Sequence, residues 1–275
     1  STGVSKGRFG RFGDPIVLGG ENAPLTVDES ADAFVASIND LTLAVSVYAP
    51  FQSYRDAGFP CQINGGPDTE VTVPEGNWLI DCGDLRVQRS LTFEGGNLIF
   101  EGDISIGADG HMRVNTNNSS VYSWAPGSPV IATDHSPNSA WIYMQSGVIS
   151  KSGSGSIELA NTMVYLSATS TLSFSGGSGS MLWSAPRFGP FKDLALWSES
   201  AFDHNFSGSA SLSMEGIFFL PKATMVYTGN GGQASVEAQF VANMAEVQGN
   251  GSIRIAPRFD QAIKHPPPAI TELIR

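Results

Sequence analysis

Charged side chains are scarce in this chain of 275 residues, where Asp, Glu, Lys and Arg together make up 15%. An average soluble domain has about 25%. The balance is acidic, with a formal net charge of −11, and basic residues cluster only at Lys6–Arg11. Because nucleic-acid binding needs clustered Lys and Arg to neutralise phosphates, this composition argues against nucleic acid as a partner.

Long apolar runs are also missing from the sequence. No segment approaches the roughly 18 unbroken apolar residues of a membrane span, and no charged-then-apolar signal peptide opens the chain. Hydrophobic residues nevertheless make up 41%, which is typical of a globular protein. We therefore expect a folded domain with a substantial core and no membrane helix within these residues.

Cysteine occurs only twice, at Cys61 and Cys82. A disulfide between them would stabilise the fold by roughly 3 kcal/mol in the chain-entropy model. The alternative is two free buried thiols, whereas zinc binding is disfavoured because two Cys with no close His cannot fill a tetrahedral site. We predict a Cys61–Cys82 disulfide and hence an oxidising compartment.

Short apolar runs separated by turn residues fill the chain from Glu70 onward, as in VTVPEGNWLIDCGDLRVQRSLTFEGGNLIFEGDISI. The 31 glycines lie mostly at the breaks, and the spacing leaves no room for helical crossovers. This pattern predicts an all-β fold, a right-handed parallel β-helix (β-solenoid) over 70–257. A β-sandwich or jelly roll is the alternative, although its strands are usually longer.

The two ends of the chain differ from this middle part. Residues 1–25 are predicted to be an extended arm, and 26–69 a capping helix with a lead-in loop. The helix is expected at about 28–40, since a capping box at Thr26–Glu29 precedes apolar residues at helical spacing, namely Ala31, Phe34, Val35, Ile38 and Leu41. We expect it to cover the open end of the solenoid, and the tail 258–275 to cover the other end.

Candidate catalytic side chains are present without a motif that assembles them. The histidines His111, His135 and His204 each lie near an aspartate, and we expect solvated turns at all three. A polysaccharide hydrolase or lyase would draw on acids that the sequence scatters, namely Asp81, Asp84, Asp103, Asp134 and Asp203. We therefore predict no catalytic residue, no cofactor and no metal site, while a single calcium held by loop carboxylates and carbonyls stays open.

Aromatic residues concentrate between residues 183 and 206. Such rings either cover a core or form an exposed platform that stacks on sugars or partner proteins. The residues that would contact a partner or a glycan are Trp183, Phe188, Phe191 and Trp197. A second candidate contact is the polar stretch 115–138, which we expect to project from the coils as a loop.

Several segments resemble a known family in order over about 60–275. They are LTFEGGNLIFEGDISIGADGHMRV, WSAPRFGPFKDLALWSES, EGIFFLP, TGNGGQASVEAQF and the terminal LIR. These are similar to the secreted portion of actinobacterial TadE/TadG-like proteins, accessory components of the tight-adherence (Flp) pilus. The resemblance implies a β-rich extracytoplasmic domain without assigned catalysis, and membrane contact only through an N-terminal anchor missing from this sequence.

Together these observations predict a non-catalytic structural or adhesive β-solenoid at the cell surface. Its loops would meet pilus or cell-envelope proteins, a glycan or a second copy of the chain. The alternative is a carbohydrate-active β-helix that binds or cleaves an extracellular polysaccharide, for which converging carboxylates would be the distinguishing feature.

Overall fold

The computed structural model describes residues 51–66, 69–114, 139–175, 179–187, 191–207, 212–229, 233–250 and 252–258. The predicted arm, the helix at 28–40, the stretch 115–138 and the tail beyond Arg258 lie outside these residues. Within them there is no helix that could cross a membrane.

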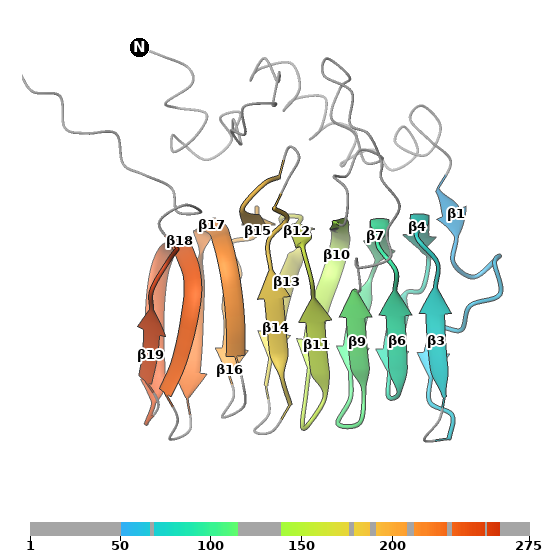
Figure 1. Ribbon diagram of the computed structural model, residues 1–275, viewed down its shortest axis with the longest axis horizontal. Helices are drawn as coiled ribbons and strands as arrows, with labels where there is room; N and C mark the ends of the chain where they lie inside the picture. The colour runs from blue at the N-terminus through green and yellow to red at the C-terminus, as the bar shows by residue number, and fades with distance from the viewer. Residues whose placement is uncertain are drawn as a thin grey trace, which may run out of the picture.

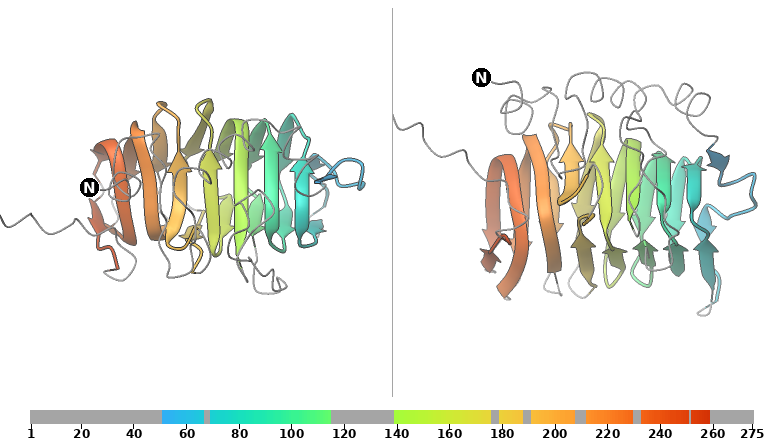
Figure 2. Two further views of the ribbon diagram at one scale, coloured as in Figure 1. Left: turned by 90° about the horizontal axis from the view of Figure 1, so that it is seen from above. Right: turned by 45° about the horizontal axis from the view of Figure 1, so that its top comes forward.

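The predicted parallel β-helix is confirmed, and the sandwich alternative is excluded. In the described part of the chain, nineteen strands wind into a stack of about seven turns, here called coils (Figures 1 and 2). Strand β3 (Glu70–Val73) pairs with β6 (Ser90–Phe93), β4 (Gly76–Ile80) with β7 (Gly96–Glu101), and β5 (Asp84–Val87) with β8 (Asp103–Ile106), all in parallel. The remaining strands are β1 (Gln52–Ser53), β2 (Gln62–Ile63), β9 (His111–Val114), β10 (Ala140–Lys151), β11 (Ser156–Leu159), β12 (Thr162–Leu166), β13 (Ser170–Phe174), β14 (Met181–Ser184), β15 (Leu194–Ser198), β16 (His204–Ser207), β17 (Leu212–Gly229), β18 (Gln233–Gly249) and β19 (Ser252–Ile255).

Each coil has three sides, so the solenoid has three faces. Face A contains β1, β4, β7, the first half of β10, β12, β15 and the middle of β17. Face B contains β3, β6, β9, β11, β14 and the start of β17. Face C contains β2, β5, β8, the second half of β10, β13, β16 and the end of β17.

Alternate residues of each strand point into the solenoid and stack on their counterparts in the next coil. In β12, for example, Val164 and Leu166 belong to the inner core while Met163 and Tyr165 point outward. Aromatic pairs occur along the core, including Phe93–Phe100 and Trp183–Phe218 with ring centroids 5.9 and 5.0 Å apart. Burying each such side chain contributes about 1.5–3 kcal/mol, so this core is the main source of stability.

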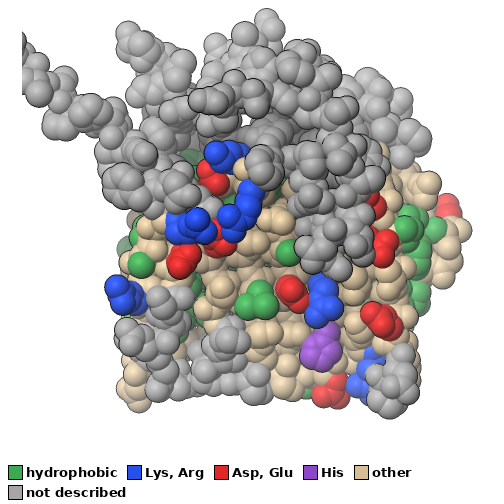
Figure 3. Space-filling view, viewed as in Figure 1, with side chains coloured by type: hydrophobic (Ala, Val, Ile, Leu, Met, Phe, Trp, Pro, Cys, Tyr) green, Lys and Arg blue, Asp and Glu red, His purple; other side chains and the backbone are tan. Residues whose placement is uncertain are grey.

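The outward rows of faces B and C are largely polar. On face B, Arg113 and Glu158 are paired in register and form an ion pair of 2.7 Å. On face C the outward row is Gln62, Arg86, Ser105, Ser150, Ser173 and Asn205. Figure 3 shows the face B side as mostly uncharged surface, on which charged side chains of both signs lie in small groups. These two faces therefore follow the alternation expected of strands with one solvated side.

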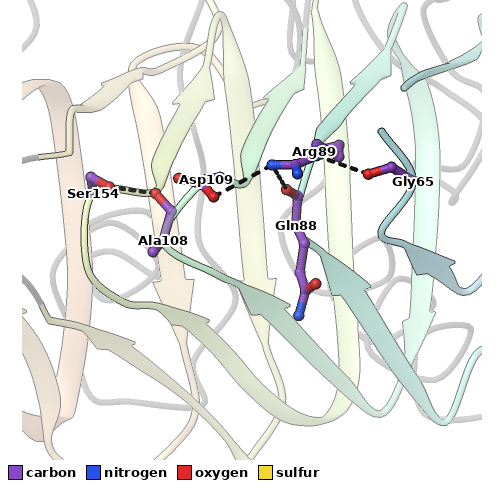
Figure 4. A network of polar contacts seen from close by, with 6 residues as sticks. All are labelled: Gly65, Gln88, Arg89, Ala108, Asp109 and Ser154. Atoms are coloured by element: carbon purple, nitrogen blue, oxygen red, sulfur yellow. Dashed lines mark hydrogen bonds and ion pairs between the residues drawn. The ribbon is translucent and has the colours of Figure 1, made fainter. Parts of the chain in front are cut away.

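The corners between faces C and B are tied from coil to coil by polar contacts (Figure 4). Arg89 donates from Nε to Gly65 O at 3.1 Å and pairs through Nη1 with Asp109 at 3.4 Å. Ser154 Oγ donates to Ala108 O at 2.6 Å. Each contact joins residues of neighbouring coils, so the corners are held in the same stacking register as the strands.

Three strands are longer than the short apolar runs of the sequence indicate, namely β10, β17 and β18, with 12, 18 and 17 residues. The apolar runs Gly216–Leu220 and Thr224–Tyr227, which Pro221 and Lys222 separate in the sequence, both lie in the single 18-residue strand β17. A shift in the pairing with β18 between Leu220 and Thr224 marks the corner, where Pro221 lies. A bulge of this kind bends a strand without ending it, which is why Pro is tolerated there.

The N-terminal end of the solenoid is covered by residues 51–66. The part expected to be a lead-in loop contains β1 and β2, which pair with β4 and β5. Tyr54 stacks on Phe59 at 5.1 Å, and Phe59 packs edge-on against Trp78 at 5.5 Å. The predicted Cys61–Cys82 disulfide is confirmed and joins this cover to the first complete coil.

Reducing this disulfide is expected to lower the free energy of unfolding by about 3 kcal/mol, because the bond closes a loop of 21 residues. Thermal unfolding with and without reductant measures the effect as a lower midpoint. A Cys61→Ser/Cys82→Ser variant is the control, since its midpoint must not respond to reductant. An unchanged midpoint for the native protein would contradict the stabilising role.

Candidate functional site

Three of the candidate acids lie in one row, at the positions where the chain enters the strands of face C. Asp84 and Asp103 are directly paired between β5 and β8. The row continues through Val148 and Thr171, and Thr171 Oγ1 donates to the carbonyl of Asp203 at 2.8 Å. With about 4.8 Å between neighbouring strands, Asp203 lies roughly 14 Å from Asp103. The coil stack therefore brings Asp84 and Asp103 together and leaves Asp203 apart, while Asp134 is outside the described residues.

These carboxylates bind other parts of the coils. Asp84 pairs with Arg86 at 2.6 Å, and Asp103 accepts a hydrogen bond from the Val148 N–H at 2.9 Å. Asp81, at the corner before β5, accepts bonds from Ser53 Oγ and the Arg55 N–H. Burial alone would raise the pKa of the Asp81 carboxyl, but these hydrogen bonds outweigh it and lower the pKa. The described part of the chain contains no cluster of three or more His, Cys, Asp or Glu side chains that could hold a metal.

The prediction of a solvated turn is wrong for His204, which is completely buried. The residue begins β16, and its alternation places the ring among the inner layers of face C. Nδ1 accepts a hydrogen bond from the Leu172 N–H at 3.1 Å, and Nε2 lies 2.9 Å from Ser198 Oγ. His111, by contrast, is exposed and contacts Ser156, while His135 lies outside the described residues.

These contacts assign the proton on the His204 ring. Because Nδ1 accepts from a backbone N–H, a neutral ring carries its proton on Nε2 and donates it to Ser198. A base that activates a serine must instead accept the serine proton. Burial lowers the pKa of His204 to about 4, against a smaller opposing effect of the Asp203 carboxylate. The pair therefore stabilises the coil and is not a nucleophile with its base.

The candidate contact aromatics that the structure describes are buried, which fits the alternative in which such rings cover a core. Trp183, Phe191 and Trp197 have 3, 9 and 6% of their surface accessible, and Phe188 lies outside the described residues. Trp183 points into the solenoid, where its ring packs on Phe218 and its Nε1 donates to Thr162 O at 3.1 Å. Strand alternation thus places Trp183 in the core, whereas Trp197 and Phe191 belong to a second cluster outside the core.

This second cluster is built on the outward side of face A. Its central row, here called the aromatic ladder, has one residue from each of seven successive coils, in register: Leu79, Ile99, Tyr143, Tyr165, Trp197, Phe219 and Val241. Ring centroids are 5.3 Å apart for Tyr143–Tyr165 and 5.7 Å for Tyr165–Trp197. Beside the ladder, Trp141 stacks on Tyr143 and on Phe191.

Period-two alternation predicts one apolar side per strand and therefore does not reveal the ladder. Its strands in fact contain unbroken apolar runs, such as WIYM in β10 and MVYL in β12, every residue of which is buried. Unbroken runs are typical of strands covered on both faces. Burial raises the pKa of Tyr143 and of Tyr165, and the Glu199 carboxylate adds to both effects, so the two phenols stay neutral.

The burial of Lys151 was also not predicted. It ends β10 two residues after Ile149, and it lies in register between Ile106 and Phe174 of the core. Only 3% of its surface is accessible, and burial lowers the pKa of its amine. The sequence does contain a signal for this burial. Residues two positions apart in a strand point to the same side, and Ile149 points inward.

The fold and these clusters define a parallel β-solenoid with polar faces B and C and an apolar, aromatic face A. Comparison of the chain with protein-family models, curated proteins and solved structures gave no match.

Burial of His204 predicts a loss of stability in acid. Its pKa is about 4 when folded and 6.5 in the reference state, so the unfolded chain binds more protons between these values. The free energy of unfolding therefore keeps the full contribution of the neutral histidine above pH 6.5, and about 3 kcal/mol of this free energy is lost as the pH falls to 4. Urea unfolding at a series of pH values measures this loss.

His204→Asn removes the titrating group and is expected to flatten the dependence over this range. His111→Asn is the matched control at an exposed histidine, and its profile should follow that of the native protein. If the His204→Asn profile kept the native slope, the buried imidazole would not be its source.

Proposed function

We propose that this protein is a non-catalytic structural or adhesive rod at the cell surface, associated with a pilus or another envelope assembly. One observation supports the proposal most strongly. The side chains that could take part in catalysis, Asp81, Asp103 and His204, each form a hydrogen bond with a neighbouring coil. A side chain that bonds a neighbouring coil in this way has fewer lone pairs and protons left for a substrate.

The disulfide supports an extracellular location, because such bonds persist in oxidising compartments. The similarity of several segments to TadE/TadG-like proteins supports a link to a tight-adherence pilus. The expected partner is an envelope protein or a surface glycan.

We expect the protein to act by presenting a rigid polar surface to its partner. Seven coils at about 4.8 Å each give a rod roughly 30 Å long. On faces B and C, equivalent outward positions repeat at that spacing, and they include the exposed charges Arg86, Arg113 and Glu158. A partner with a repeating polar surface, such as a glycan chain or a pilus subunit array, fits a surface of this kind.

Polysaccharide cleavage is the second candidate, favoured by the direct pairing of Asp84 with Asp103. Retaining glycosidases hold two carboxyl groups about 5–5.5 Å apart, close to the spacing of adjacent coils. The contacts of both acids oppose this role, because Asp84 pairs with Arg86 and Asp103 accepts a hydrogen bond from the Val148 N–H.

Labelling intact cells of the source organism with a membrane-impermeant amine reagent tests the proposed location. Lys192 is exposed and should be modified, whereas Lys151 is buried and should be modified only after unfolding. Mapping both sites by mass spectrometry separates surface display from cell lysis, with a cytoplasmic protein as the control.

Modification of Lys192 only after lysis would contradict surface display. A non-catalytic role would be overturned if the purified protein released reducing ends from a polysaccharide and Asp84→Asn abolished that release.

A further inference from the structure

The two ends of the solenoid differ in how far they cover the core. One inward row of face C follows the whole stack, from Ile63 in β2 through Phe174 and Tyr227 to Val247 in β18. Ile63 has 1% of its surface accessible and Tyr227 has 3%, whereas Val247 has 54%. The row is therefore covered at the N-terminal end and open at the other end, where β18 and β19 lie (Figure 1).

The backbone of β18 is open at this end as well. On face C, residues 244–249 of β18 pair on one side with 224–229 of β17. On the other side no partner strand exists among the described residues, because β19 pairs with residues 233–236 on face B. All residues from 243 to 250 are exposed. The N–H and C=O groups along this outer edge are therefore available to a further strand.

The sequence of this edge has none of the features that keep strand edges from pairing. Natural edge strands are protected by Lys, Pro, bulges or a covering segment. Residues 243–249 read NMAEVQG, with a single charge at Glu246, and 244–249 pair with β17 without a bulge. Met244 has 57% of its surface accessible. An unprotected edge with exposed apolar side chains is suited to the addition of a strand.

The described chain ends away from this edge. The Ala256 N–H donates to Val236 O at 2.9 Å, which extends the pairing of β19 on face B. Arg258 Nη1 then donates to Glu215 Oε1 at 3.0 Å, where β17 passes from face B to face A. Face A therefore separates Arg258 from the open edge on face C. This course favours a strand from another molecule.

We propose that this strand comes from a second copy of the chain, so that two solenoids associate end to end through antiparallel pairing of residues 244–249. Since residues 51–66 cover the core at the N-terminal end, the open cores belong to C-terminal ends. A contact between two identical ends is two-fold and closes as a dimer. The two-fold axis crosses the solenoid axis and reverses the strand direction, which makes the pairing antiparallel. The dimer is a rod of about fourteen coils.

The side chains limit the register of this pairing. Ala245 and Val247 continue inward rows of the core, so inward residues of one copy must oppose inward residues of the other. Two Glu246 side chains cannot be directly opposite, because like charges there destabilise the pair. Placing Val247 opposite its equivalent satisfies both conditions, since Glu246 then faces Gln248. This register also covers the most exposed member of the inward row.

Sedimentation equilibrium of the full chain over a range of concentrations tests the proposal. The native protein is expected to be a dimer, and Val247→Lys should raise the Kd of the dimer by about 100-fold or more, because two ammonium groups would face each other. Phe202→Lys is the matched control, since Phe202 is 57% exposed and lies outside the edge. A native monomer, an open-ended filament or a dimer that Val247→Lys leaves intact would overturn the proposal.

Two further measurements locate the contact. Val247→Cys should form a disulfide between copies on mild oxidation, because opposed residues of antiparallel strands have Cα atoms about 4.5–5.5 Å apart, within disulfide range. Phe202→Cys should not form one. The amides of residues 244–249 should exchange slowly in the native dimer and fast in Val247→Lys. A dimer without the Val247→Cys disulfide, or slow exchange of these amides in a monomer, would contradict the proposed pairing.

Discussion

The parallel backbone ladder between successive coils is the constraint on which the rest of the structure depends. Once one residue of a coil is paired with its equivalent in the next, every other residue has a fixed neighbour above and below. The corners must then stack as closely as the strands. Gly96 has φ = +92°, and a Cβ there would lie 2.1 Å from the carbonyl oxygen of Gly76 in the preceding coil. Only glycine allows this approach.

The same register determines what the side chains can do. It stacks Asp84 on Asp103, aligns Arg113 with Glu158, and encloses His204 between Leu172 and Ser198. Equivalent positions of successive coils lie one above another at the spacing of the strands. Their side chains therefore form rows along the solenoid and seldom converge on one point. This geometry suits an extended binding surface better than a pocket that surrounds a small substrate.

The fold could be predicted from local signals, whereas the composition of the faces could not. Short strands, turn glycines and the two cysteines indicated a β-solenoid and its disulfide because each depends on neighbours in sequence. The environments of His204 and Trp197 depend on register instead. Trp78 pairs with Leu98, Leu98 with Ile142 and Ile142 with Val164, so successive coils contain very different lengths of chain. No fixed repeat in the sequence could have aligned them.

The central claim, that close stacking in register maintains the solenoid, is tested most directly by Gly96→Ala against Gly83→Ala in urea unfolding. A Cβ at Gly83 meets nothing within 4 Å, so that variant should be neutral or slightly stabilising. Gly96→Ala should lower the free energy of unfolding by about 2–5 kcal/mol, from the left-handed backbone and the clash together. Equal stability of the two variants would contradict the account.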